Sequence, residues 1–244
     1  MQFTSEQRLD DGVVERRFAL DEIPGILWAP GSTSSAPPVP LILLGHQGGL
    51  QGMYPRLVAR GLQAAKDGFA SAAIELPGSG DRPPIPALEE ARADLRRAIK
   101  AGEPPGEIVD QLIYPLVEQA VPEAQAALDA LLTLPEIGGP VALSGGVISI
   151  GIRLAVVEPR IVAANLFAGS FVPAAMLEEA RHVTIPLHVL LQWDDEGNDR
   201  QLALDLFDAF GSTEKTLSAN LGGHTGVPRY AGEEAGRFLA RHLR

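Results

Sequence analysis

The chain between positions 139 and 151 decides the expected fold, and it reads Gly139-Pro140-Val141-Ala142-Leu143-Ser144-Gly145-Gly146-Val147-Ile148-Ser149-Ile150-Gly151. The apolar run from Val141 to Leu143 is typical of a short strand. The apolar segment from Val147 onward has the length of a helix and reaches Pro159. Small residues around Ser144 separate the two runs. The stretch therefore predicts a strand, a sharp turn and a helix.

Ser144, on the expected turn, is the first candidate for a catalytic nucleophile. A serine there stands clear of the sheet edge, and the helix behind it offers N–H groups and a positive dipole end to a developing oxyanion. The usual pattern is Gly-x-Ser-x-Gly, and the chain has the small Ala142 in place of the first glycine and Gly146 as the second. Ser149 is a rival, but it lies more than a helical turn past the expected strand, so we interpret it as a helix residue.

Composition narrows the class of protein. A chain of 244 residues fits a single α/β domain, here residues 1–244 with one insertion. The net charge of −11 argues against nucleic acid or an anionic membrane as a partner. The absence of cysteine excludes disulfides, thiolate metal sites and a cysteine nucleophile. We expect no metal and no cofactor, and the oligomeric state is left open, with a homodimer as one option.

The N-terminal residues 1–12 are polar and charged, which speaks against a secretory signal, and no segment has the length of a membrane span. A cytoplasmic location is therefore expected. Strands are expected at 13–20, 25–29, 41–44, 69–74, 161–167, 187–191 and 215–219, in addition to the one before Ser144. Helical patterns separate most of them, for example at 54–67, 199–210 and 231–243. This order predicts a mostly parallel, doubly wound sheet of about eight strands, with an antiparallel start and helices on both faces.

Residues 83–120 are longer than a simple crossover needs. Helical patterns at 87–101 and 107–132 follow one another without an intervening strand. One interpretation is a helical insertion, a candidate lid over the carboxyl edge of the sheet, and the other is an elongated crossover pair without contact to substrate. As a lid, the segment would bring Ile85 and Tyr114 to an apolar part of the substrate.

Residues suited to catalysis follow several expected strands, where doubly wound sheets gather their chemistry. Ser144 is followed in the chain by Asp194 and Asp195, and then by His224 in a glycine-rich loop. A serine hydroxyl needs an imidazole base, and the imidazole needs a carboxylate that fixes its tautomer. Asp195 is the first choice for that acid, and Asp194 stays open as the alternative. The acidic loop is superficially similar to a calcium loop but lacks its full ligand series.

The loop after the strand at 41–44 supplies the other half of an expected oxyanion hole. The N–H of Gln47 or Gly48 would join that of Gly145, and His46 is a candidate for contact with the substrate. The alternative is a phosphate cradle, but neither the lysine or hydroxyl partner nor the spaced glycines of such loops are present.

Over nearly its whole length the chain resembles the α/β-hydrolase family, and within it the dienelactone-hydrolase-like and small esterase branch. The resemblance is carried by the segments 44–49, 77–82, 143–146, 192–196 and 222–224. It implies that Ser144 is the nucleophile, Asp195 the acid and His224 the base. Three departures stand out: Gln47 where many members have glycine, Ala142 at the elbow, and a serine where true dienelactone hydrolases use cysteine.

The sequence therefore predicts a serine hydrolase that cleaves small carboxylic esters, thioesters or lactones through an acyl-enzyme on Ser144. Two alternatives remain. A protein of this fold can bind a small ligand or a partner without turnover, and the same triad can transfer the acyl group to another acceptor.

Overall fold

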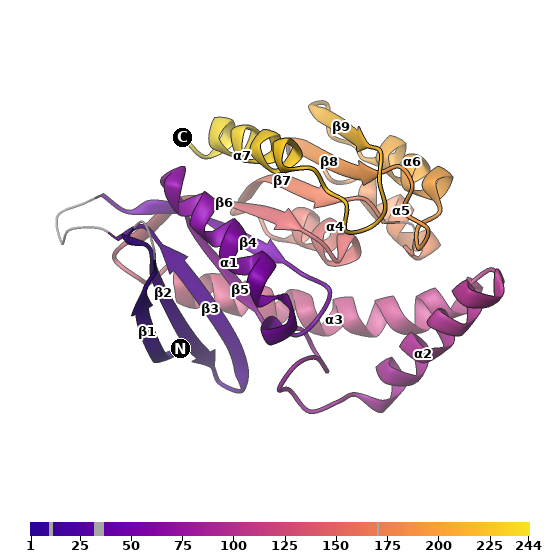
Figure 1. Cartoon of the computed structure of the whole chain (residues 1–244), viewed down its shortest axis with the longest axis horizontal. Helices are drawn as coiled ribbons and strands as arrows, with labels where there is room; N and C mark the ends of the chain where they lie inside the picture. The colour runs from indigo at the N-terminus through magenta and orange to yellow at the C-terminus, as the bar shows by residue number, and fades with distance from the viewer. Residues whose placement is uncertain (10–11, 32–36, 170) are drawn as a thin grey trace.

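A single nine-stranded sheet forms the centre of the computed structural model, which describes residues 1–9, 12–31, 37–169 and 171–244 (Figure 1). Its strands are β1 (Gln2–Arg8), β2 (Val14–Leu20), β3 (Ile23–Ala29), β4 (Val39–Gly45), β5 (Ala70–Ile74), β6 (Ile137–Gly145), β7 (Ile161–Phe167), β8 (Leu187–Gln192) and β9 (Lys215–Asn220). Their order is β1-β2-β3-β5-β4-β6-β7-β8-β9.

The sheet is antiparallel at one end and parallel elsewhere. β1, β2, β3 and β5 pair antiparallel in that order, and every pair from β5–β4 to β8–β9 is parallel. This confirms the expected mostly parallel sheet with an antiparallel start. The strand that the sequence pattern missed is β1, whose seven residues are all exposed, so no alternation of polar and apolar residues marks it.

Seven helices lie in the described part of the chain: α1 (Leu50–Lys66), α2 (Pro86–Ala101), α3 (Gly106–Leu131), α4 (Ile148–Val157), α5 (Ala174–Ala180), α6 (Arg200–Ala209) and α7 (Arg229–Leu243). α1 and α7 cover one face of the sheet, and α3 to α6 cover the other. Figure 1 shows the two layers on either side of the strands. None of the helices in these described ranges combines the length and hydropathy that crossing a membrane requires.

The central strand β4 is apolar on both faces, as its continuous run of leucine and isoleucine predicts. Leu41 and Leu43 pack in the cluster under α3 and α4, whereas Ile42 and Leu44 pack in the cluster under α1 and α7. All four side chains are buried. Because both faces are covered, this strand has no polar positions before it ends at Gly45.

The segment 83–120 contains α2 and the first half of α3. Gly102 ends α2 in the left-handed conformation, with φ of 68°. α2 packs on α3, and Figure 1 shows it farther from the sheet than α3. The second half of α3 packs on the sheet through residues such as Leu128 and Leu131, which are fully buried. A lid function for this segment stays a prediction.

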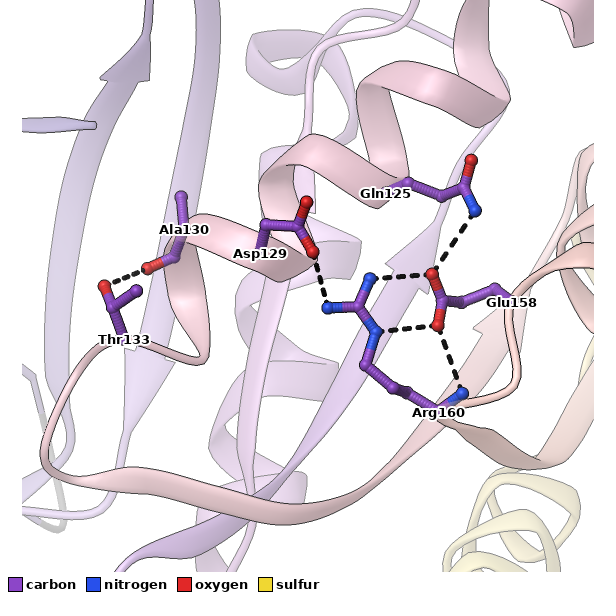
Figure 2. A network of polar contacts seen from close by, with 6 residues as sticks. All are labelled: Gln125, Asp129, Ala130, Thr133, Glu158 and Arg160. Atoms are coloured by element: carbon purple, nitrogen blue, oxygen red, sulfur yellow. Dashed lines mark hydrogen bonds and ion pairs between the residues drawn. The ribbon is translucent and has the colours of Figure 1, made fainter.

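A charged network joins the end of α4 to α3 at the start of β7 (Figure 2). The Arg160 guanidinium donates to both carboxylate oxygens of Glu158 at 2.7 Å and to Asp129 at 2.6 Å. Gln125 also donates to Glu158. The hydrogen bonds from the Arg160 side chain lower the pKa of Glu158 to about 2. The Glu158 side chain is only 3% exposed, so this ion pair is screened little by solvent.

We predict that this pair makes stability depend on pH. A carboxyl group with a lowered folded-state pKa stabilises the protein above its unfolded pKa of 4.5, and the contribution is lost as the pH falls toward about 2. This contribution to the free energy of unfolding is at most about 3 kcal/mol, because each unit of pKa difference corresponds to about 1.4 kcal/mol. Glu158→Gln is expected to lower the free energy of unfolding at neutral pH and to flatten its decline in acid, as measured by urea denaturation.

The matched control is Asp129→Asn, because this side chain is 70% exposed and contacts the same guanidinium. Its effect should stay within about 0.5 kcal/mol. Equal pH profiles for wild type and Glu158→Gln would contradict the assignment.

Candidate active site

His224 and Asp195 form a hydrogen-bonded pair beyond the ends of β9 and β8. The two contacting atoms, His224 Nδ1 and Asp195 Oδ2, are 2.7 Å apart. Asp195 is buried, and its other carboxylate oxygen accepts from the N–H of Gly197 at 3.0 Å. The His224 side chain is 48% exposed. A carboxylate on Nδ1 leaves Nε2 as the nitrogen that can exchange a proton with a substrate.

Asp194 has a different role from its neighbour. Its carboxylate accepts from the N–H of Gly222 at 3.2 Å, and its own N–H donates to the Gly222 carbonyl. Gln192 adds a bond from its side-chain amide to the carbonyl of Gly223 at 3.0 Å. Asp194 and Gln192 therefore tie the loop after β8 to the loop that carries His224, and Asp195 is the carboxylate that reaches the imidazole.

Ser144 lies inside strand β6 and is not part of the turn. It pairs with Leu44 on one side and with Asn165 on the other, and it is buried. Its hydroxyl accepts from the Asn165 amide at 3.3 Å. Within the ranges that the structure describes, no hydrogen bond joins Ser144 to His224. The sequence-based role of Ser144 as nucleophile stays a prediction, and this arrangement gives it no contact with the base.

A buried polar row continues from Ser144 across the sheet. The side-chain oxygen Oδ1 of Asn165 is 2.8 Å from His188 Nδ1, and His188 Nε2 is 2.9 Å from the Ser218 hydroxyl. Burial lowers the pKa of His188, which favours a neutral ring that donates to Asn165 and accepts from Ser218. The row occupies the face covered by α7, where the His188 ring contacts Phe238.

The turn between β6 and α4 consists of Gly146 and Val147, and Val147 is the N-cap residue of α4. Gly145, just before it, has a φ of +104°. A Cβ on Gly145 would lie 2.6 Å from the carbonyl oxygen of Gly45, so only glycine fits there. The strand, turn and helix expected from the sequence are confirmed, with the turn two residues later than Ser144.

Arg60, from α1, lies half-buried beneath the ends of β4 and β6. It donates to the carbonyl of Gly45 at 3.0 Å and to the carbonyl of Ser144. Burial lowers its pKa to about 10, so the guanidinium still carries its charge at neutral pH. Nothing in the sequence pattern singles out this arginine, which follows the helix periodicity of its neighbours.

The residues predicted to form the oxyanion hole, and His46, predicted to contact substrate, lie in the loop after β4 and at the end of β6. Gln47 is exposed and Gly48 half-buried in the loop before α1, whereas Gly145 is paired within the sheet to Gly45 and Leu166. Both ring nitrogens of His46 contact backbone carbonyls, those of Gly48 and Ile74. His46 therefore holds its own loop and has no ring nitrogen left for a substrate.

A cavity opens at the carboxyl ends of β4, β5 and β6. Its wall is mainly apolar and includes Leu43, Ala124, Val147 and Ile150, and the polar residues along it include His46, Glu75 and Ser144. Ile85 and Tyr114 do not line it. Both carboxylate oxygens of Glu75 accept from the N–H of Leu50 at the start of α1, at 3.0 Å. No group of three His, Asp or Glu side chains suited to a metal occurs in the described part of the chain.

Solved structures similar to this chain share its architecture. A cold-adapted esterase from an Arctic intertidal metagenomic library is 27% identical with a TM-score of 0.72, and both chains are covered completely. An acetyl xylan esterase from Paenibacillus sp. R4 is 14% identical with a TM-score of 0.64, over 98% of this chain and 88% of that one. TT1662 from Thermus thermophilus is 20% identical with a TM-score of 0.64, over 95% and 98%.

No family model matches this chain, and a search of curated proteins also gave no match. The sheet order, the helices on both faces and the structural neighbours confirm the expected α/β-hydrolase fold. The narrower resemblance to the dienelactone-hydrolase branch stays a prediction.

We predict that Gly145→Ala destabilises the protein by more than a positive φ alone explains. The new Cβ would meet the carbonyl of Gly45 at 2.6 Å and the Arg60 guanidinium at 2.9 Å, in addition to the strain of the φ angle. Gly68→Ala is the matched control, because Gly68 has a φ of +86° and nothing within 4 Å of its Cβ position. The control should cost about 1 kcal/mol, and Gly145→Ala about 2 kcal/mol more, as measured by chemical denaturation. Equal costs would show that the two strand ends do not need this close approach.

Proposed function

We propose that this chain hydrolyses small carboxylic esters, with His224 as the acid–base group and Asp195 as the carboxylate that orients it. The observation that carries the proposal is the 2.7 Å contact between His224 Nδ1 and the buried Asp195 carboxylate. It lies beyond the carboxyl ends of adjacent parallel strands, where doubly wound folds bind their ligands. The likeness to the Arctic esterase over the whole chain supports ester cleavage as the reaction.

The pair supplies what ester hydrolysis needs from a base. With Nδ1 bound to Asp195, the His224 Nε2 accepts the proton of the attacking group and returns it to the leaving alkoxide. The carboxylate of Asp195 stabilises the imidazolium that forms in between. The apolar wall of the cavity at the ends of β4, β5 and β6 suits a modest apolar acyl or alcohol group. Thioesters and lactones share this chemistry and belong to the same substrate class.

The sequence-derived form of the mechanism makes Ser144 the attacking group and passes through an acyl-enzyme. For that, the Ser144 hydroxyl has to leave Asn165 and come within hydrogen-bond reach of His224. Labelling with a fluorophosphonate probe, with the adduct located by mass spectrometry in wild type, Ser144→Ala and Ser149→Ala, tests this role. An adduct that disappears only in Ser144→Ala supports it.

A second candidate function is binding of a small ester-like ligand without turnover. The bond between Ser144 and Asn165 favours it, because it holds the hydroxyl in the sheet and away from the base. Binding without hydrolysis would appear as thermal stabilisation by p-nitrophenyl esters that remain intact. Acyl transfer from the same site would instead appear as a new ester or amide when an alcohol or amine is added.

We predict that His224→Ala and Asp195→Asn lower kcat/KM for p-nitrophenyl acetate and butyrate by about 10²–10⁴-fold, the usual contribution of a general base and of the group that orients it. Asp194→Asn is the neighbouring control and should cost less than about tenfold, because Asp194 bonds Gly222 and leaves the imidazole untouched. The proposal fails if wild type hydrolyses no ester in a graded series, or if the three variants are equally active.

A further inference from the structure

The position from which this fold presents a nucleophile is the turn between the strand β6 and the helix α4. In this chain, that turn is Gly146 and Val147, and the first helical residue is Ile148. Ser144 precedes the N-cap residue by three positions and remains hydrogen-bonded within the sheet. Its location corresponds to the strand that leads into an elbow.

The small residues around Val147 have the spacing of an elbow. Gly145, two residues before it, needs positive φ and the absence of a Cβ. Ser149, two residues after it, is 0% exposed, so a small side chain fits there. In the pattern Gly-x-Ser-x-Gly, these two positions are the small residues on either side of the nucleophile. The residue in the nucleophile's place is therefore Val147.

The direction of the Ser144 side chain agrees with Val147, and not Ser144, being in the nucleophile's position. Successive side chains of a strand alternate between the two faces of the sheet. Leu143 packs in the cluster under α3 and α4, whereas Ala142 packs in the cluster under α1 and α7. Ser144 therefore shares the face of Ala142 and contacts Asn165 there. The hydroxyl points into the layer beneath α7.

The base lies close to the turn. The His224 ring packs edge-on against the Phe167 ring, with 5.5 Å between their centroids. A Cβ placed on Gly146 would lie 3.8 Å from the Cβ and the carbonyl oxygen of Phe167. Phe167 thus lies beside Gly146 of the turn and packs on the imidazole, so one residue links the turn to His224.

We propose that Val147 occupies the nucleophile position of this site, so that no acyl-enzyme forms and water attacks the ester directly. This inference rests on the proposed function. The oxygen of water bonds to the ester carbonyl carbon while His224 Nε2 takes its proton, which gives a tetrahedral oxyanion. The bond from carbon to the alkoxy oxygen then breaks, and the imidazolium returns the proton to the leaving alcohol. The products are a carboxylic acid and an alcohol, with no redox change.

The start of α4 provides donors for that oxyanion. The first N–H groups of a helix have no partner within it. α4 has no side-chain cap and no acidic residue in its first turn, so no side chain of the cap or the first turn competes for these N–H groups. The loop with the exposed Gln47 and the half-buried Gly48 follows β4, which pairs with β6, and provides the second donor.

The test is to supply the missing hydroxyl. Val147→Ser should acquire a fluorophosphonate adduct at position 147, located by mass spectrometry, and should show a burst of p-nitrophenol equal to the enzyme concentration with p-nitrophenyl acetate. The adduct should persist when Ser144→Ala is added and disappear when His224→Ala is added. Val147→Ala controls for the change of side-chain size and should remain unlabelled. Wild type should show neither adduct nor burst.

Three results would overturn the inference. One is a wild-type adduct on Ser144, the second is a wild-type burst, and the third is a folded Val147→Ser that stays unlabelled. If Val147→Ser does not fold, the labelling and burst measurements on the wild-type protein still test the inference. Failure of the proposed function looks different: wild type would hydrolyse no ester, while Val147→Ser would still be labelled in a manner that depends on His224.

Discussion

The close approach of the ends of β4 and β6 is the constraint on which the site depends. The two strands meet at Gly45 and Gly145, where a single Cβ on Gly145 would overlap a carbonyl oxygen. Arg60 donates to the carbonyls of Gly45 and Ser144 from beneath and so holds both ends with one charged group. The loop with His46 and the turn with Val147 both begin here, which fixes where each can place its backbone N–H groups.

The acid–base pair depends on a second set of backbone ties, at the ends of β8 and β9. Asp194 and Gln192 bind the glycines on the N-terminal side of His224, and Asp195 binds the imidazole itself. The loop is rich in glycine and is anchored at several points. The arrangement positions a half-exposed imidazole without burying it, so that it can contact both its carboxylate and solvent.

Much of this was predictable from the sequence, and the limits have physical reasons. The periodicity of apolar residues predicted the sheet and its antiparallel start. The polar residues that follow the expected strands indicated the strand ends that carry Asp195 and His224. The sequence alone could not decide which of the adjacent carboxylates Asp194 and Asp195 contacts His224. Asp194 instead accepts from a backbone N–H of Gly222, and no sequence pattern predicts a contact with a loop so distant in the chain. The sequence could not fix which residue stands at the turn after β6, because Ser144, Gly145 and Gly146 are all small. Only the close contact between β4 and β6 shows that Gly145 is the glycine that needs positive φ.

The buried polar row from Ser144 through Asn165 and His188 to Ser218 has a consequence for folding. Parallel strands made of repeated leucine, valine and alanine carry little information about how far each should slide along its neighbour. A slip by one residue would turn these polar groups into the apolar layer under α3 to α6 and leave their donors and acceptors unpaired. The row therefore specifies the register of the parallel strands, because folding intermediates with shifted strands would bury unpaired polar groups.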